Sequence, residues 1–261
     1  MTSEQDREEP LTPAEVREIL KICSAGGLLV GGQALAFWAD FLAVALPPIL
    51  SSSVSSDADF IGDVALARNL ARTLRWNEWV PSMDDATPHT AKVTKRAAGG
   101  GVKQVDFLSG VAGLVTRDLE RRAVDVEVPE LGRVRVIHPI DVLESRIQNL
   151  HLLAEKRTKT GIAQAVLAVD VARAFIRRTI AEQGERSALK LLERVVTIAG
   201  ETAGLRVHLK FDVEPLNAVP LDDFRTTVAL HSVRWPQALA EIAAKRQKLR
   251  SAATRRKRKP K

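Results

Sequence analysis

A double glycine followed by three aspartates constrains this chain more than any other feature of its sequence. Gly31 and Gly32 follow the apolar run 28–30 and precede a second apolar segment, a pattern that predicts a strand turning into a helix. Because glycine lacks a β-carbon, a phosphate could approach the backbone amides at the helix start. The alternative is a tight turn that binds nothing, since such glycine pairs are common in turns.

Two of the aspartates lie in a short strand predicted over 57–60. Residues i and i+2 of a strand point to one face, so Asp57 and Asp59 would project side by side, about 6.5 Å apart. This spacing suits two divalent ions about 4 Å apart, an arrangement used for displacement at phosphorus. A neighbouring strand over 102–108 could add Asp106, which is awkward to bury without a partner or an ion. The alternative is that Asp57 and Asp59 lie at a solvated strand end and that Asp106 caps a neighbouring helix.

The periodicity of the sequence predicts an α/β half followed by an all-α half. Alternation predicts a hairpin over 89–96 and 102–108 and a second strand pair over 123–128 and 133–137. The helices predicted in the first half lie at 14–23, 33–45 and 63–75. From Pro139 onward the period is helical, and the helices predicted there lie at 139–155, 161–183, 185–203 and 235–250.

In their order, Gly-Gly, Asp-x-Asp and a later single Asp resemble the signature of the polymerase-β-like nucleotidyltransferase superfamily. The Gly-Gly-Gln-Ala-Leu opening at 31–35 and the Asp-Ala-Asp-Phe strand at 57–60 are most similar to the AbiEii-type toxin nucleotidyltransferases and their relatives. Residues 136–153 resemble the junction into the helical domain of such proteins, and the resemblance covers roughly residues 14 to 245.

The resemblance implies an α+β fold. It predicts a polymerase-β-like nucleotidyltransferase domain, with a mixed sheet flanked by helices, at 13–138, and an α-helical bundle domain at 139–245. A flexible N-terminus at 1–12 and a basic, disordered tail at 246–261 are expected to flank them.

The resemblance also implies an activity, namely the Mg²⁺- or Mn²⁺-dependent transfer of a nucleoside monophosphate from an NTP to an acceptor hydroxyl. Asp57, Asp59 and Asp106 would be the catalytic residues and the metal ligands. Asp106 would lie nearest the acceptor and is a candidate general base. The nucleotide-binding residues that it implies are Gly31, Gly32, Gln33, Ser56, Arg146 and Lys156.

The helical half departs from the family's pattern. Lys159 is followed by Thr160 where an Asp is expected, and Gln164 stands near where a further acid would help. Arg146 shares a helix face with Leu153, so its alternative role is the polar edge of an interdomain contact. Two functions therefore remain open. One is a toxin-like nucleotidyltransferase with RNA, such as tRNA, as acceptor and an antitoxin as partner, and the other is an impaired module that binds NTP or a protein.

The positive charge of the chain is concentrated at its C-terminal end. Residues 245–261 hold ten basic side chains and no acid, so removing them from the net charge of +7 leaves −3 for residues 1–244. Such a tail attracts RNA or DNA by neutralising phosphates, with a strong salt dependence. The alternative is a disordered terminus that only aids solubility.

Composition sets the remaining expectations. The chain is 45% hydrophobic and 27% charged, as in soluble globular proteins, and Cys23 as its only cysteine excludes an intramolecular disulfide and a cysteine-based zinc site. The polar, acidic start excludes a secretory signal there, so a cytoplasmic location without membrane contact is expected. The apolar stretch 26–50 is divided by glycines and prolines and contains Asp40, which predicts a buried strand and helix instead of a membrane span.

Overall fold

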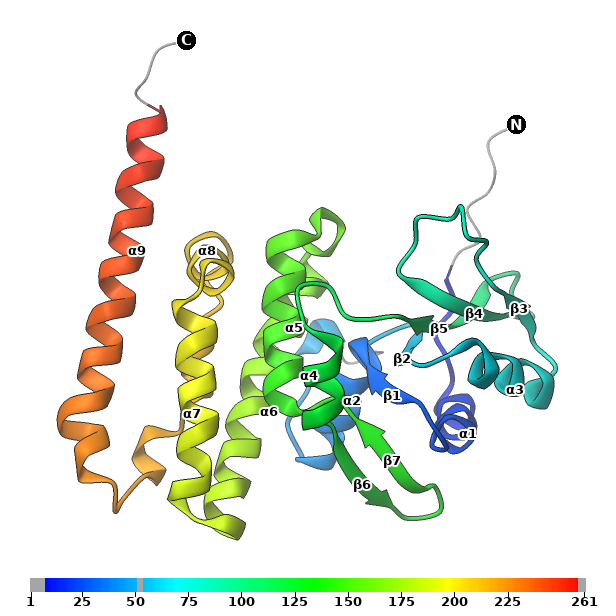
Figure 1. The fold of residues 1–261 in the computed structure, drawn as a ribbon, viewed down its shortest axis with the longest axis horizontal. Coiled ribbons are helices and arrows are strands. Elements are labelled where there is room, and N and C mark those ends of the chain that lie inside the picture. The colour runs from blue at the N-terminus through cyan, green and yellow to red at the C-terminus, as the bar shows by residue number, and fades with distance from the viewer. Residues whose placement is uncertain (1–7, 51–53, 258–261) are drawn as a thin grey trace. The chain divides into compact units, whose positions relative to one another are not determined.

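The computed structural model describes residues 8–50 and 54–257. The chain divides into two compact units, Met1–Ser145 and Arg146–Lys261, whose elements are labelled in Figure 1. The division falls inside helix α5 (Pro139–Leu152), whereas the sequence predicted a boundary just before the first residue of this helix.

A mixed seven-stranded sheet forms the centre of the first unit, in the order β3-β4-β5-β2-β1-β7-β6. Strands β2 and β5 pair in parallel, as do β1 and β7, and the other neighbours are antiparallel. The strands are β1 (Leu28–Val30), β2 (Ala58–Ile61), β3 (Asn77–Trp79), β4 (His89–Arg96), β5 (Val102–Leu108), β6 (Val124–Val128) and β7 (Gly132–Val136). The prediction of an α+β fold with a mixed, helix-flanked sheet is confirmed.

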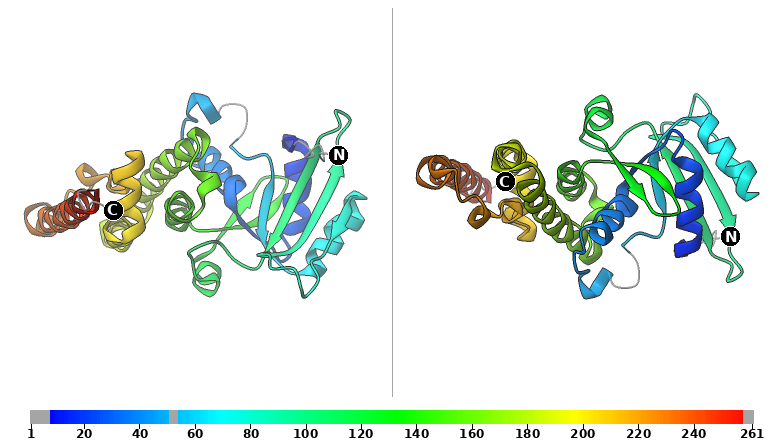
Figure 2. Two further views of the ribbon diagram at one scale, coloured as in Figure 1. Left: turned by 90° about the horizontal axis from the view of Figure 1, so that it is seen from above. Right: turned by 90° about the horizontal axis from the view of Figure 1, so that it is seen from below.

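Helices lie beside this sheet, as the views in Figure 2 show. They are α1 (Pro13–Cys23), α2 (Gly31–Phe41), α3 (Val64–Leu74) and α4 (Thr116–Arg122). Helix α1 packs against α3, α3 against β4, and α2 against β1 and β2. The predicted cap of α1 is present, since the Thr12 hydroxyl accepts from the Glu15 amide and the Glu15 carboxylate accepts from the Thr12 amide.

The predicted flexible N-terminus needs correction over its described part. The Glu9 amide donates to the Val102 carbonyl at 2.9 Å, and the Leu11 amide donates to the Ser56 carbonyl at 3.1 Å. These backbone hydrogen bonds tie residues 9–11 to the first residue of β5 and to the segment before β2, where β5 has no partner from β2. Residues 1–7 lie outside the described part of the chain.

The apolar stretch 26–50 is core, as predicted. Trp38 of α2 is fully buried, and its indole N–H donates to the Ile137 carbonyl at 2.8 Å, which satisfies the one polar atom of a large apolar side chain. On the neighbouring strands, the rings of Phe60 and Phe107 stack with centroids 5.9 Å apart. Among the described residues, no helix combines the length and apolar character that a membrane crossing needs.

In the described residues of the second unit, every regular element is helical. These are α6 (Lys159–Gln183), α7 (Glu185–Gly200), α8 (Thr202–Phe211) and α9 (Trp235–Lys257), joined by short 3₁₀ turns and one π-helical turn. Helix α6 packs on α7, and α9 packs on both α7 and α8. Helices α7, α8 and α9 and the 3₁₀ turn Pro215–Ala218 together bury an apolar cluster made of Ala199, Leu205, Leu216 and Ile242.

Most of the predicted disordered tail is instead helical. Helix α9, coloured orange to red in Figure 1, continues to Lys257. Residues 246–257 are rich in Ala, Arg, Lys and Gln, which favour helix, and the first strong helix breaker is Pro260. The charge run was thus mistaken for disorder, although residues 258–261 lie outside the described part of the chain.

Candidate metal centre

Three carboxylates converge at one end of the parallel pair β2 and β5. The register places Asp59 directly beside Asp106, and Asp57 directly precedes β2. One oxygen from each of Asp57, Asp59 and Asp106 lies within 4.8 Å of the others. The prediction that a neighbouring strand brings a third carboxylate to the pair is confirmed.

Gly31 and Gly32 lie directly behind these carboxylates, at the start of α2. Gly31 has φ of +67°, and a β-carbon added there would lie 1.8 Å from Oδ2 of Asp59. A β-carbon at Gly32 would lie 2.3 Å from the Ser55 hydroxyl. Glycine at both positions thus leaves room for the side chains of Asp59 and Ser55, and the positive φ at Gly31 also favours glycine there.

A hydrogen-bond chain connects the helix start to the first carboxylate. Gln33 donates from its amide nitrogen to the Ser55 carbonyl at 3.2 Å, and the Ser55 hydroxyl donates to Oδ1 of Asp57 at 2.6 Å. Ser56, the serine predicted to bind nucleotide, donates instead to Glu8 at 3.0 Å. The structure thus places Ser55 beside the aspartates, where the sequence analysis had placed Ser56.

Asp106 is the most deeply buried of the three, with 6% of its surface exposed. Its Oδ2 accepts from the Gln104 side chain at 2.8 Å and lies 3.4 Å from Nε2 of His89. Its Oδ1 is buried and accepts no hydrogen bond from the described residues, although Nζ of Lys92 lies 3.5 Å away. One oxygen of this carboxylate therefore keeps coordinating capacity.

Sequence reasoning missed the two basic neighbours of Asp106. They are His89 and Lys92. A signal was available, because the hairpin pairs Thr94 with Gln104 and therefore Lys92 with Asp106. Extending the predicted hairpin register by two residues would have placed Lys92 beside the third carboxylate.

The residues present fit a hard divalent cation. Carboxylate oxygens are the ligands that Mg²⁺ and Mn²⁺ prefer. Asp57 and Asp59 are partly exposed, so an ion from the solvent could reach them. The buried Oδ1 of Asp106, which accepts no hydrogen bond, needs a further partner. Three carboxylates this close repel one another, and a bound cation would remove that repulsion.

Arg146 and Lys156, predicted to bind the triphosphate, belong to the second unit. Arg146 is buried, and its Nη1 donates to Oε1 of Gln164 at 3.4 Å. Lys156 is exposed and ends a 3₁₀ turn at Ala154–Lys156. A β-carbon at Gly161 would lie 1.9 Å from the Lys156 carbonyl, so this turn packs closely on the start of α6. Their nucleotide-binding roles stay predictions.

No protein-family model and no curated protein matches the chain. Among solved structures, it is similar to the polyadenylate synthase of Megavirus, with 12% identity and a TM-score of 0.37, over 64% of this chain and 36% of that chain. It is also similar to JHP933 from Helicobacter pylori, with 13% identity and a TM-score of 0.37, over 93% of this chain and 91% of that chain. The chain thus spans little more than a third of the viral enzyme, and similarity at this level does not identify a family.

Proposed function

We propose that this protein is a metal-dependent nucleotidyltransferase that moves a nucleoside monophosphate from an NTP to an acceptor hydroxyl. The observation that carries the proposal is the convergence of Asp57, Asp59 and Asp106 against two glycines at a helix start, where an added β-carbon would meet Asp59 or Ser55. Carboxylates suited to divalent ions, next to the amides of a helix start, are what a nucleoside triphosphate requires. Mg²⁺ or Mn²⁺ is the proposed cofactor.

In the proposed reaction, the acceptor oxygen bonds to the α-phosphorus, the bond from that phosphorus to the leaving oxygen breaks, and pyrophosphate leaves. Asp57 and Asp59 orient the triphosphate from the partly exposed side of the cluster. Asp106 faces the acceptor and takes up the hydroxyl proton, while Gln104 fixes the orientation of its carboxylate. Bound divalent ions would polarise the α-phosphate and favour ionisation of the acceptor hydroxyl.

For the acceptor we propose RNA, with tRNA as one candidate, because the cationic end of α9 suits a polyanion. A toxin-like role with an antitoxin partner follows only from the family resemblance, and a cytoplasmic location follows from the polar, acidic start of the sequence; both are part of the same proposal. A second candidate is a module that binds NTP without transferring it. Thr160, in place of the expected acid, and the neutral Gln164 beside Arg146 favour this alternative.

The test is incubation of the full chain with each labelled NTP, Mg²⁺ and total cellular RNA. Wild type is compared with Asp106→Asn, which keeps the size of the side chain but removes its charge. The matched control is Asp84→Asn, the same chemical change on an exposed residue outside the cluster. We expect label in RNA with wild type and with the control, but not with Asp106→Asn.

Three other outcomes would change the proposal. Label in protein would replace RNA by a protein hydroxyl as the acceptor. Metal-dependent NTP binding without transfer would favour the binding module. Transfer by Asp106→Asn at the wild-type rate would exclude a catalytic role for the third carboxylate, because its charge would then be dispensable.

A further inference from the structure

A hollow of about 210 Å³ lies within the second unit, between the end of α5 and helix α8. Four of its lining side chains are basic or can become so, and none is acidic. The lining residues are Leu150, His151, Arg157, Arg206, Val207, Lys210 and Phe211. Of the apolar ones, Leu150 and Val207 are buried and Phe211 is partly buried.

The positive charge of this hollow is not neutralised by the protein. In the part of the chain that the structure describes, neither Arg206 nor Lys210 forms an ion pair. The nearby acid Glu214 is already bound by both terminal nitrogens of Arg246, at 2.7 and 2.8 Å, and lies 3.3 Å from His208. Three permanent cations therefore share a concave surface without a counter-ion from the described residues.

Two of the basic side chains, those of Arg157 and Lys210, make contacts that restrict their positions. Arg157 donates from Nε to the Leu150 carbonyl at 3.0 Å and from Nη2 to the His151 carbonyl at 2.6 Å, which caps the end of α5. Lys210 lies over the ring of Phe211, 5.1 Å from its centroid. Arg206 and Lys210 are four residues apart on α8, so they occupy the same helix face. Such preorganisation reduces the entropy lost when an anion binds.

The imidazole of His151 is affected by the positive charges around the hollow. It is half-buried, and burial, together with the positive charges of Arg206 and Arg157, lowers the pKa of its imidazole below the usual range. The charged groups that face it are Arg157, Arg206 and Lys210. A bound anion would offset their repulsion and raise this pKa again.

We propose that this hollow is a phosphate-binding site, formed by Arg157, Arg206, Lys210 and His151. Guanidinium and ammonium groups around a concave surface recognise the oxygens of a phosphate group through charge-assisted hydrogen bonds. The phosphate could belong to a polynucleotide backbone, to a nucleotide or to the free ion, because all three share this chemistry. The site involves none of the three aspartates, so the inference does not depend on the proposed transfer activity.

The test is titration of the full chain, without divalent metal, with inorganic phosphate, with ATP and with a short single-stranded oligoribonucleotide. Binding is followed by calorimetry and by the NMR-monitored titration of His151. The test variant is Arg206→Gln with Lys210→Gln. The matched control is Arg186→Gln with Lys190→Gln, an exposed Arg and Lys with the same four-residue spacing on α7 and the same loss of charge.

We expect at least one phosphate source to bind, with about tenfold or greater loss of affinity in the test variant, because charge-assisted hydrogen bonds have this strength. Wild type and control should bind alike, and bound phosphate should raise the pKa of His151 in both. The source that binds most tightly identifies the class of ligand. Equal losses in test and control variants would overturn the proposal, since attraction would then depend on overall charge. Absence of binding by all three probes would also overturn it, as would an unchanged His151 titration.

Discussion

At the residue scale, the cluster of three aspartates is a source of repulsion that the binding of a cation should relieve. One oxygen from each of Asp57, Asp59 and Asp106 lies within 4.8 Å of the others. We expect Mg²⁺ or Mn²⁺ to raise the melting temperature, with about 2.7 kcal/mol of stabilisation at a concentration one hundred times the dissociation constant. Thermal melts with and without metal measure this effect. The double variant Asp57→Ala, Asp59→Ala should lose the response, and an equal response in both proteins would contradict the metal site.

Two glycines that both require positive φ provide a second test of the site. Gly31 has φ of +67° and Gly100 has φ of +84°, but an added β-carbon meets Asp59 only at Gly31, whereas nothing lies within 4 Å at Gly100. Substitution by alanine should cost about 1–2 kcal/mol of backbone strain at either position. Only Gly31→Ala should also displace the Asp59 carboxylate and abolish the thermal response to metal. Loss of that response in Gly100→Ala as well would show that the readout reflects general destabilisation.

The residues of the candidate site were only partly predictable from sequence. The convergence of the three aspartates followed from strand periodicity and the order of the motifs. The hydrogen bond from Ser55 to Asp57 could not be predicted, because it depends on how the irregular segment before β2 turns. The contact of His89 with Asp106 also depends on an irregularity in the β4–β5 register between His89 and Ala91, which no alternation of residues reveals.

At the element scale, one carboxylate couples the first turn of α7 to a distant loop. Glu185 accepts hydrogen bonds from the backbone amides of Arg225, Thr226 and Thr227 and from the Thr227 hydroxyl, all at 2.7–3.0 Å. The hydrogen bond from Thr227 is the main cause of a pKa of about 2 for Glu185, against the ordinary 4.5. Because the folded-state pKa is depressed, the contribution to stability is complete above pH 4.5 and is lost as the pH falls towards 2.

Hydrogen exchange measures this coupling directly. The amides of Thr226 and Thr227 should be protected at pH 5 and lose protection progressively between about pH 4.5 and 2, beyond the general loss of other amides. In Glu185→Gln, which cannot ionise, their protection should be low at pH 5 and independent of pH over this range. Protection that persists unchanged to pH 2 in wild type would show that other contacts hold the loop.

The elements that sequence reasoning predicted well are those with a clear periodicity. The β4–β5 hairpin has the predicted bounds, because alternating residues flank a run of glycines. The strand β3 was missed since all three of its residues are exposed and leave no alternation. The predicted helix 185–203 is interrupted at Glu201, where the backbone is extended, and a β-carbon at Gly204 would lie 2.0 Å from the Ile198 carbonyl. Such a bend depends on close packing, and the periodicity of hydrophobic residues does not reveal it.

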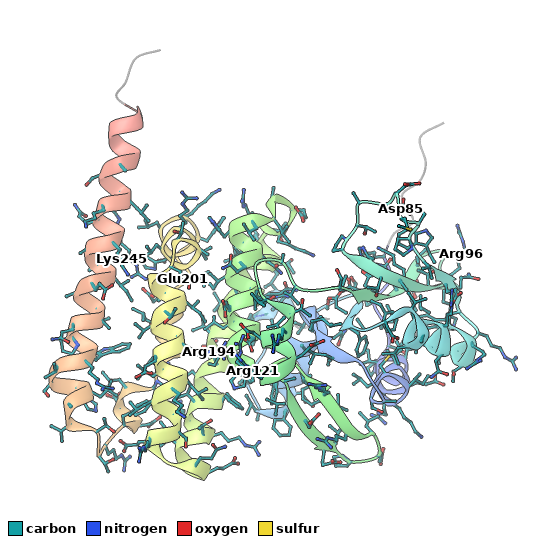
Figure 3. All side chains as sticks on the ribbon, in the orientation of Figure 1. Asp85, Arg96, Arg121, Arg194, Glu201 and Lys245 are labelled. Carbon is teal, nitrogen blue, oxygen red and sulfur yellow. The ribbon has the colours of Figure 1, made fainter. Side chains whose placement is uncertain are left out.

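At the scale of the whole molecule, helix α9 connects the core of its unit to a cationic end. Arg246 forms two hydrogen bonds to Glu214, which holds the middle of the helix on the unit. Lys245, labelled in Figure 3, pairs with Glu241 on the same helix at 2.7 Å. Both basic residues thus have structural partners, so a deletion that tests nucleic-acid binding has to begin after them.

Deletion of residues 251–261 should leave the fold intact and weaken binding to RNA. It removes six basic side chains, namely Arg255, Arg256, Lys257, Arg258, Lys259 and Lys261. Each phosphate neutralised on a single strand contributes about 0.7 to the slope of log affinity against log salt, so the slope should fall by up to about 4. Filter binding of a single-stranded RNA between 50 and about 200 mM salt measures this slope.

A variant that replaces the same six residues by glutamine is the matched control for length, since glutamine also favours helix. It should match the deletion, because the effect depends on charge and not on the presence of the last helical turns. Near-wild-type slopes for both proteins, with unchanged melting temperatures, would show that the cationic end of α9 serves solubility and that RNA contacts, if any, lie elsewhere. A lowered slope in the deletion alone would assign the effect to the backbone or length of α9.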